Sequence, residues 1–365
     1  MEFYATMPPG IEDIASEEVK KLGGKIKEIR RNKGRIFFEG DKSLIPKLNF
    51  FARCVERFIV LLEKSEFERL EDIYKSIKRL DFYFLKGKTF AVRSLRVGEH
   101  DFTSIDVARV AGQAIIDSYM ESYGERLKVN LNEPDVIIRV DVVNNEFYVG
   151  IDTTGDDALH KRWWRVYNHP AHLNSTIACA MIKLAEWDKG KSLIDPMCGS
   201  GTIPIEAALI GRNIPTGKNR EFAYFKLIGR EIPNYEENND VMELYGVEKF
   251  KKHVIGAIKN AENAGVLDTI EFKVGDATKL NGVYDCIVTN PPYGLRIASK
   301  KMIRELYIKF LKSAKDCIHD KSKIVIITAE DKLLRTAVEI SKLNINHERF
   351  VKYGGLNTRV FVLTQ

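Results

Sequence analysis

The tetrapeptide Asn290-Pro291-Pro292-Tyr293 brings together groups that can hold a planar amine. It follows residues 284–288, a short apolar run that predicts a buried strand. Two consecutive prolines predict a rigid loop, because they continue neither a strand ladder nor a helix. The Asn290 amide oxygen and the Pro291 carbonyl can each accept an amine hydrogen, and the Tyr293 ring can stack on a heterocycle. A strand and a turn with a core-packed tyrosine is the non-functional alternative.

A glycine-containing loop lies roughly 90 residues earlier in the chain. Residues 192–195 predict a short strand and residues 203–210 a helix, and Gly199 and Gly201 lie between them. A strand, a glycine loop and a helix form the first turn of a nucleotide-binding fold, where glycine lets the backbone approach a ligand closely. The loop lacks both the lysine of a triphosphate site and the third glycine of a dinucleotide fingerprint. Asp195, at the end of the strand, suits an amine-bearing ligand.

Two acidic residues follow the next two predicted strands. Residues 244–248 predict a strand that ends at Glu248, and residues 270–274 predict one that is followed by Asp276. A carboxylate at the end of the second strand is placed to bind a ribose, and one after the third can accept from an adenine amino group. Solvated loop acids are the alternative interpretation.

A strand over residues 89–96 and a helix over residues 105–123 enclose a polar loop. We expect Ser104 to cap this helix and the chain to gather cations near its first turn. Such groups can contact phosphates. The candidates for RNA binding here are Arg93, Arg96, His100 and Ser104. A solvated loop explains the same residues without a ligand.

Two further basic segments are candidates for RNA binding. Residues 160–167 mix cations with aromatics, and we expect Arg162 and Arg165 to contact RNA there. A domain junction that buries two tryptophans is an equally good explanation. After the Asn290 loop, the cations near a target base are Arg296, Lys300, Lys301 and Arg304, with a solvated helix face as the alternative.

The bulk composition limits the classes of function. The chain has 365 residues, enough for two or three domains, and a net charge of +6 that permits a polyanionic partner. Its five cysteines form no Cys-x-x-Cys pair, so we expect no metal site and no disulfide framework. No apolar run is as long as a membrane span, and residues 1–6 do not start a signal peptide. We therefore expect a cytoplasmic protein with no membrane contact.

The order of the predicted elements gives the fold class and the domains. Residues 1–60 resemble a ferredoxin-like unit, residues 61–155 form a second α+β region, and residues 156–175 are a linker. Residues 176–365 predict a Rossmann-like α/β domain of seven strands that ends in an antiparallel hairpin about Gly354 and Gly355. Within it, residues 211–240 predict an irregular excursion.

The second region resembles a known RNA-binding module. The residues that carry this likeness are Phe90–Arg93, Arg96–Gly98, His100–Ser104 and Asp106–Ala108, which look like the THUMP domain. That resemblance implies recognition of the 3′ end of tRNA.

The last domain resembles the class I S-adenosylmethionine-dependent methyltransferases in its strand layout and in both loop motifs. The resemblance implies S-adenosyl-L-methionine as the cofactor and methylation of an exocyclic amine. The implied catalytic residues are Asn290, Pro291, Pro292 and Tyr293. The implied cofactor-binding residues are Asp195, Met197, Cys198, Gly199, Ser200, Gly201, Thr202, Glu248, Asp276, Ala277, Asn290 and Thr176.

Taken as a whole, the chain resembles the THUMP-containing tRNA guanine-N2-methyltransferases. The pattern is closest to the archaeal and bacterial members that modify position 6 in the acceptor stem. Related enzymes that modify position 10 typically carry Asp-Pro-Pro-Tyr, where this chain has Asn290. Methylation of position 10 or of ribosomal RNA, and a non-catalytic RNA-binding protein, are the alternatives; the THUMP-like segment disfavours DNA. We expect a monomer.

Overall fold

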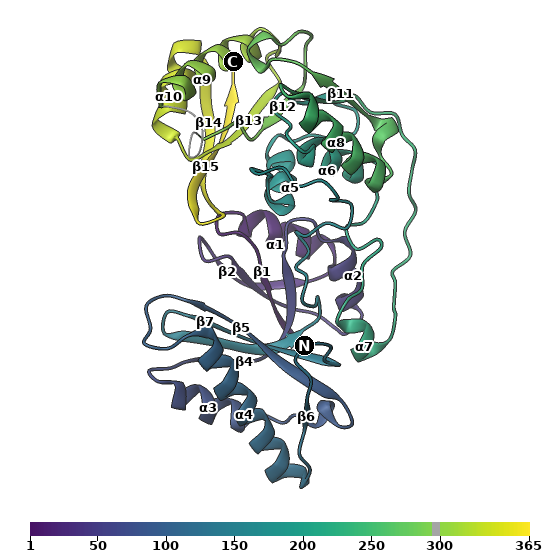
Figure 1. The fold of residues 1–365 in the computed structure, drawn as a ribbon, viewed down its shortest axis with the longest axis vertical. Coiled ribbons are helices and arrows are strands. Elements are labelled where there is room, and N and C mark those ends of the chain that lie inside the picture. Colours follow the sequence, from purple (N-terminus) through teal and green to yellow (C-terminus); the bar gives the residue numbers. More distant parts are fainter. Residues whose placement is uncertain (294–299) are drawn as a thin grey trace.

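The computed structural model describes residues 1–293 and 300–365, and these form two sheets with helices packed against them (Figure 1). In chain order, the strands and helices are β1 (Glu2–Thr6), α1 (Glu12–Lys21), β2 (Lys25–Arg30), β3 (Arg35–Glu39), α2 (Leu44–Phe51), β4 (Arg57–Glu66), α3 (Leu70–Lys78), β5 (Thr89–Val97), α4 (Ser104–Tyr123), β6 (Lys128–Val129), β7 (Val136–Val143), β8 (Glu146–Asp152), α5 (Ser175–Leu184), β9 (Leu193–Asp195), α6 (Thr202–Gly211), α7 (Tyr224–Ile228), β10 (Leu244–Glu248), α8 (Lys251–Ala264), β11 (Ile270–Val274), β12 (Cys286–Thr289), α9 (Lys300–Lys315), β13 (Lys323–Thr328), α10 (Asp331–Ser341), β14 (Asn344–Tyr353) and β15 (Leu356–Thr364).

The N-terminal sheet joins the ferredoxin-like unit to the region that follows it. Its order is β2-β3-β1-β4-β8-β7-β5-β6. The long strand β4 pairs with β1 on one side, where Phe3 faces Val60, and with β8 on the other, where Glu66 faces Glu146. A single ladder therefore crosses the predicted boundary at residue 60, which lies inside β4.

The C-terminal sheet has the order β11-β10-β9-β12-β13-β15-β14. The strands from β9 to β13 run parallel, and β15 is antiparallel to both β13 and β14. Parallel neighbours need crossover connections, which α6, α8 and α9 supply. The strand order changes direction between β9 and β12, and open α/β sheets bind their ligands at such a switch point. The predicted Rossmann-like domain with a terminal hairpin is confirmed.

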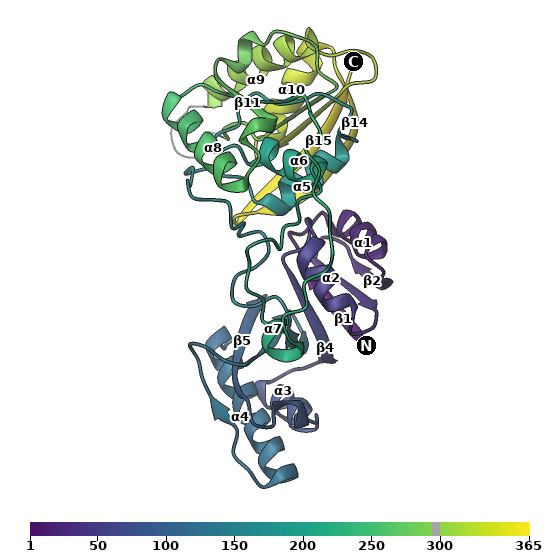
Figure 2. The same cartoon turned by 90° about the vertical axis from the view of Figure 1, so that its right-hand side faces the viewer.

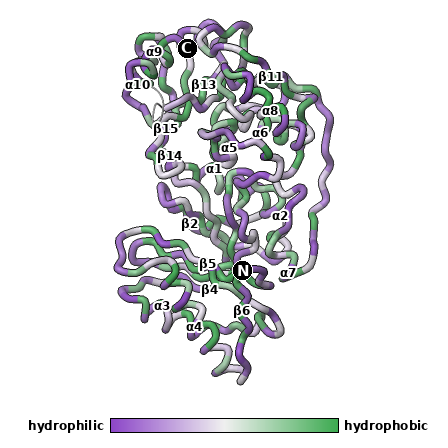
Figure 3. Tube along the Cα trace, in the orientation of Figure 1, coloured by the Kyte–Doolittle hydropathy of each residue, from purple (hydrophilic) through white to green (hydrophobic). Residues whose placement is uncertain are grey.

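The excursion after α6 connects the two halves of the molecule. It leaves the C-terminal domain, reaches the N-terminal sheet at α7 and returns to β10 (Figures 1 and 2). The backbone amide of Ala223 donates to Thr154 at 3.3 Å, and Lys226 donates to the Pro134 carbonyl at 2.9 Å. Its return path is mostly hydrophilic, in contrast to the strands of the sheets (Figure 3).

Buried apolar side chains also join the halves. One hydrophobic cluster contains residues of the ferredoxin-like unit, such as Phe50, together with Trp164 of the linker and residues of the C-terminal domain, such as Ile205. Within the described residues, none of the helices combines the length and the apolar character that crossing a bilayer requires.

Candidate active site

The two loop motifs meet where β9 and β12 end. Thr289, the last residue of β12, donates its hydroxyl to Asp195 Oδ1 at 2.7 Å, although the two residues are 94 positions apart in the chain. The amide of Met197 donates to the same oxygen at 3.1 Å. Burial raises the pKa of Asp195 to about 7, and both hydrogen bonds oppose that rise. The fold therefore places the glycine loop beside the Asn290 loop.

Both glycines of the first loop have a left-handed backbone. Gly199 has φ +53° and Gly201 has φ +80°, a region that costs a side chain of the L configuration. A Cβ atom on Gly201 would lie 3.1 Å from the Cβ of Ala257 and 3.2 Å from the Phe272 ring. The loop consequently keeps its backbone close to α8 and β11. The other predicted loop residues, Cys198, Ser200 and Thr202, are buried in the same turn.

Glu248 is attached to the glycine loop by hydrogen bonds from the backbone. Its Oε2 accepts from the Gly199 amide at 3.2 Å, and its Oε1 accepts from the Phe250 amide at 2.9 Å. Asp276 lies at the end of the neighbouring strand and is exposed. Its Oδ1 accepts from the amide and the hydroxyl of Thr278, and these bonds lower the pKa of Asp276. Ala277, which follows it, is buried.

The Asn290 loop is supported by two tyrosines. The hydroxyl of Tyr293 donates to Asn290 Oδ1. Tyr307, on α9, donates to the Pro292 carbonyl at 3.2 Å and shares a hydrogen bond of 2.9 Å with Thr328 on β13. Burial raises the pKa of Tyr293 well above its usual value of 10. An amide oxygen has two lone pairs, so Asn290 Oδ1 can accept a second hydrogen bond.

The structure corrects the prediction that Arg162 contacts RNA. Its side chain is fully buried and pairs with Glu206 of α6 at 2.8 Å. It also donates to the carbonyls of Leu159 and Arg53, at 2.6 and 3.0 Å. A guanidinium that is enclosed and paired in this way has no surface left for a phosphate.

Arg165, three residues later, points to the glycine loop. Its Nη1 lies 3.4 Å from the Ser200 hydroxyl and 3.2 Å from the Thr202 hydroxyl. The structure therefore groups Arg165 with the predicted cofactor loop instead of with an open RNA surface.

The candidates for RNA binding in the N-terminal half lie on β5, in the loop after it and at the start of α4. Arg93 pairs with Asp156 at 2.8 Å, while Arg96 contacts the Gly98 carbonyl at 2.9 Å and the His100 ring at 3.1 Å. The prediction that Ser104 caps α4 is wrong. Thr103 is the cap and forms a capping box with Asp106, whose carboxylate accepts from the Thr103 amide at 2.9 Å.

The remaining predicted residues are spread around the C-terminal domain. Thr176 is buried in the first turn of α5 and donates its hydroxyl to Asn174 at 2.7 Å. Lys300, Lys301 and Arg304 are exposed on the first turns of α9. Arg296 lies outside the described residues.

Two supports of the site are missing from the sequence-based predictions. Asn260 of α8 donates to the Ser200 carbonyl at 3.0 Å, and its Oδ1 accepts from the amides of Val166 and Tyr167. It thus fixes the linker against the glycine loop, and nothing in the local sequence indicates this role. Thr289 could have been found, because it is the residue directly before Asn290.

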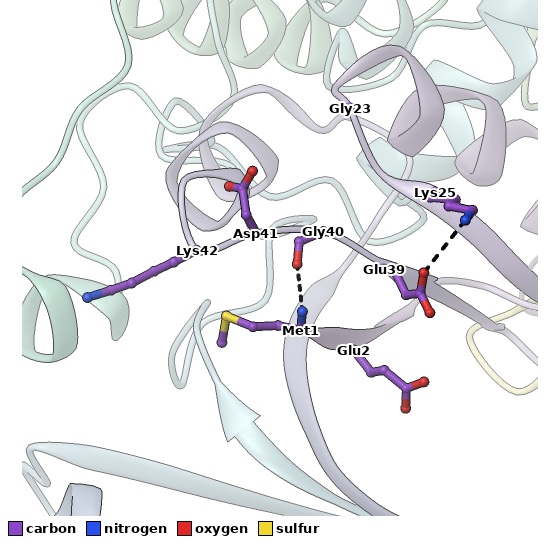
Figure 4. A pocket seen from close by; sticks show the side chains of 8 residues that line it. All are labelled: Met1, Glu2, Gly23, Lys25, Glu39, Gly40, Asp41 and Lys42. Atoms are coloured by element: carbon purple, nitrogen blue, oxygen red, sulfur yellow. Dashed lines mark hydrogen bonds and ion pairs between the residues drawn. The ribbon is translucent and has the colours of Figure 1, made fainter.

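A surface hollow of about 600 Å³ lies elsewhere, on the ferredoxin-like unit (Figure 4). There the N-terminal amine donates to the Gly40 carbonyl at 2.9 Å, and Lys25 pairs with Glu39 at 4.0 Å. None of the predicted site residues line this hollow, so it does not compete with the switch point as the candidate active site.

Three family profiles match consecutive parts of the chain. An RlmL ferredoxin-like domain matches residues 2–59, a THUMP domain matches residues 67–152, and an RMKL-like methyltransferase domain matches residues 162–359. The methyltransferase profile alone covers more than half of the chain.

Similar proteins share this arrangement over the whole length. A tRNA (guanine(6)-N2)-methyltransferase of Archaeoglobus fulgidus is 62% identical and covers 99% of this chain and 92% of its own. One of the same name from Methanocaldococcus jannaschii is 51% identical, with both chains covered completely. The crystal structure of a possible methylase from Clostridium difficile 630 is 29% identical and has a TM-score of 0.87, covering 100% of this chain and 97% of that one. The resemblance drawn from the sequence is confirmed: the chain belongs to the family of THUMP-containing methyltransferases that these relatives represent.

Proposed function

We propose that this protein transfers a methyl group from S-adenosyl-L-methionine to the exocyclic N2 amine of guanosine 6 in the acceptor stem of tRNA. The observation that carries the proposal is the Thr289–Asp195 hydrogen bond, which joins the Asn290 loop to the glycine loop. The names of the relatives that are 62% and 51% identical support this choice of base and position.

The residues of the site fit this cofactor. The left-handed Gly199 and Gly201 keep the loop backbone free of side chains, so that a ligand can approach it. Glu248 is positioned by the loop itself to accept from ribose hydroxyls, and Asp276 beside Ala277 to accept from an adenine amine. The Asp195 carboxylate would accept from the ammonium group at the amino-acid end of S-adenosyl-L-methionine. When bound, the cofactor supplies a methyl group on a sulfonium, which needs no further activation by the protein.

The protein's part in the reaction is then mainly to position the nucleophile. Asn290 Oδ1 and the Pro291 carbonyl accept the two hydrogens of the amine and stabilise the positive charge that develops on it. The Tyr293 hydroxyl orients the Asn290 amide and leaves a lone pair of Oδ1 for the substrate. The Tyr293 ring stacks on a base taken out of its helix, as enzymes that modify bases require.

We assign recognition of the tRNA 3′ end to the THUMP region, with Arg96 and His100 as contacts, and contact near the target base to Lys300. The intact glycine loop and the intact Asn-Pro-Pro-Tyr motif argue against a non-catalytic RNA-binding protein. Action as a monomer in the cytoplasm stays a prediction.

The substrate assignment is tested with methyl-labelled S-adenosyl-L-methionine and RNA transcripts. We expect label in a tRNA that carries guanosine at position 6, and a loss of label when that base alone is replaced by adenosine. Two results would contradict the assignment. One is a tRNA with adenosine at position 6 that is still labelled, at guanosine 10. The other is label in ribosomal RNA but not in tRNA.

The catalytic assignment is tested with Asn290→Ala. Removing one of two acceptors for the developing charge lowers methyl transfer by about 100- to 1000-fold. The cofactor affinity, measured by calorimetry, stays within about threefold, because Asp195 and the glycine loop remain. Asn346→Ala on β14 is the matched control, with wild-type turnover. Wild-type turnover in Asn290→Ala would remove Asn290 from the mechanism.

A further inference from the structure

The guanidinium of Arg165 lies between the glycine loop and the start of α5. Besides Ser200 and Thr202, it donates through Nη2 to the Leu173 carbonyl at 3.3 Å and to the Ser175 hydroxyl at 3.1 Å. Its Cζ is 4.9 Å from the centre of the Trp164 ring, which holds the plane of the guanidinium. The group is thus fixed against the loop that we assign to the cofactor.

All of these hydrogen-bond acceptors are neutral. In the part of the chain that the structure describes, no carboxylate forms an ion pair with Arg165, whereas Arg162 pairs with Glu206. Burial lowers the pKa of Arg165 to about 10, so the group remains a cation at neutral pH but is poorly solvated. Arg165 is half-buried, and the carboxylate of Glu206 favours its charged form without forming an ion pair with it. A carboxylate ligand in direct contact would stabilise this charge further.

The loop therefore has opposite charges near its two ends. Asp195 stands where β9 ends, and Arg165 contacts Ser200 and Thr202 where α6 begins. The amino-acid end of S-adenosyl-L-methionine is a zwitterion with one ammonium and one carboxylate. A guanidinium binds a carboxylate through two parallel hydrogen bonds, which makes it more selective than a single lysine amine.

We propose that Arg165 binds the carboxylate of the cofactor's amino-acid end, opposite Asp195, which binds its ammonium group. The inference rests on the proposed function, and it makes Arg165 a determinant of cofactor specificity. It also replaces the prediction that Arg165 contacts RNA.

The test compares two ligands that differ only in this carboxylate. Calorimetry on the full chain gives the dissociation constants of S-adenosyl-L-methionine and of its decarboxylated form. We expect wild type to prefer the intact cofactor. Arg165→Gln should weaken the intact cofactor by about 10- to 100-fold. The same substitution should change the dissociation constant of the decarboxylated form by no more than about twofold. The affinity of Arg165→Lys for the intact cofactor should lie between those of wild type and Arg165→Gln.

Arg230→Gln is the matched control. Arg230 also stacks on an aromatic ring, with its Cζ 4.9 Å from the centre of Phe225, but it lies on the distant excursion. The Arg230→Gln variant should bind both ligands with the affinities of the wild-type protein.

Two outcomes would overturn the inference. One is an equal loss of affinity for both ligands in Arg165→Gln, which indicates a purely structural role. The other is a wild-type protein that binds both ligands equally. A wild type that binds neither ligand would instead contradict the proposed function itself.

Discussion

Candidate residues at the end of β12 are held differently from those on β5. Asp195 at the end of β9 and Thr289 at the end of β12 are buried and joined by a hydrogen bond, and the half-buried Asn290 accepts from Tyr293. On β5, Arg96 instead contacts the neighbouring Gly98 and His100, and its surroundings are exposed. This difference is what we expect if the first set is fixed for chemistry and the second set meets a large polyanion at the surface. A substitution should have a large effect in the first region and a small one in the second.

The linker shows the same contrast between two residues of one type. Arg162 and Arg165 are three positions apart, yet one is paired with a buried carboxylate and the other with hydroxyls. The first stabilises the junction of the two halves, and the second is bonded only to neutral groups, which is why we propose an anionic ligand for it.

The largest expected effect is on stability, from Arg162→Met. Removing the guanidinium leaves Glu206 as a buried charge without an ion-pair partner, which costs about 3–5 kcal/mol of the free energy of unfolding. Urea unfolding measures this. Replacing both partners, as Arg162→Met with Glu206→Leu, should recover most of the loss.

The exposed pair of Arg230 and Glu221 serves as the control, because surface ion pairs contribute only about 0–1 kcal/mol. If Arg162→Met unfolds with the stability of Arg230→Gln, the Arg162–Glu206 pair does not stabilise the junction.

Much of this arrangement follows from the sequence. Apolar periodicity and turn residues predict the strands, the terminal hairpin and the position of both loops, because these depend on local backbone preferences. The burial of Arg162 depends on a residue 44 positions away, which no local pattern reveals. Glu206 did offer a signal, as an acid inside the apolar run 203–210.

The cap of helix α4 has a signal in the local sequence. Thr103 and Asp106 have the spacing of a capping box, which identifies Thr103 instead of Ser104 as the cap. The hydrogen bond from Tyr293 to Asn290, by contrast, depends on how the chain turns after the two prolines, and the sequence does not specify that path.

An intermediate effect on the free energy of unfolding is expected from the ionisation of Asp195 as the pH changes. The folded protein has a pKa of about 7 for this carboxyl, while an unfolded chain ionises near 4, so the folded state binds more protons between these values. This group's contribution to stability is therefore present at low pH and is lost as the pH rises to 7. The slope is at most about 1.4 kcal/mol per pH unit.

Asp195→Asn keeps an acceptor for Thr289 and removes the ionisation. We expect the stability of the variant relative to wild type to increase from pH 4 to pH 7 and to level off above pH 7, in urea unfolding at each pH. Parallel stability curves for the two proteins would show that Asp195 does not titrate in this range.

The smallest effects are expected on β5, and they separate its two arginines. The charge of Arg93 is offset by Asp156, whereas Arg96 forms no ion pair with any carboxylate in the residues that the structure describes. Arg96→Gln should weaken tRNA binding about threefold and reduce the slope of log affinity against log salt by about one. Arg93→Gln should change both quantities less. Filter binding over a range of salt concentrations measures both, and cofactor affinity should be unchanged in either variant. An unaltered salt slope in Arg96→Gln would place the tRNA contact on another surface, and β5 would then lose its role as the exposed counterpart of the active site.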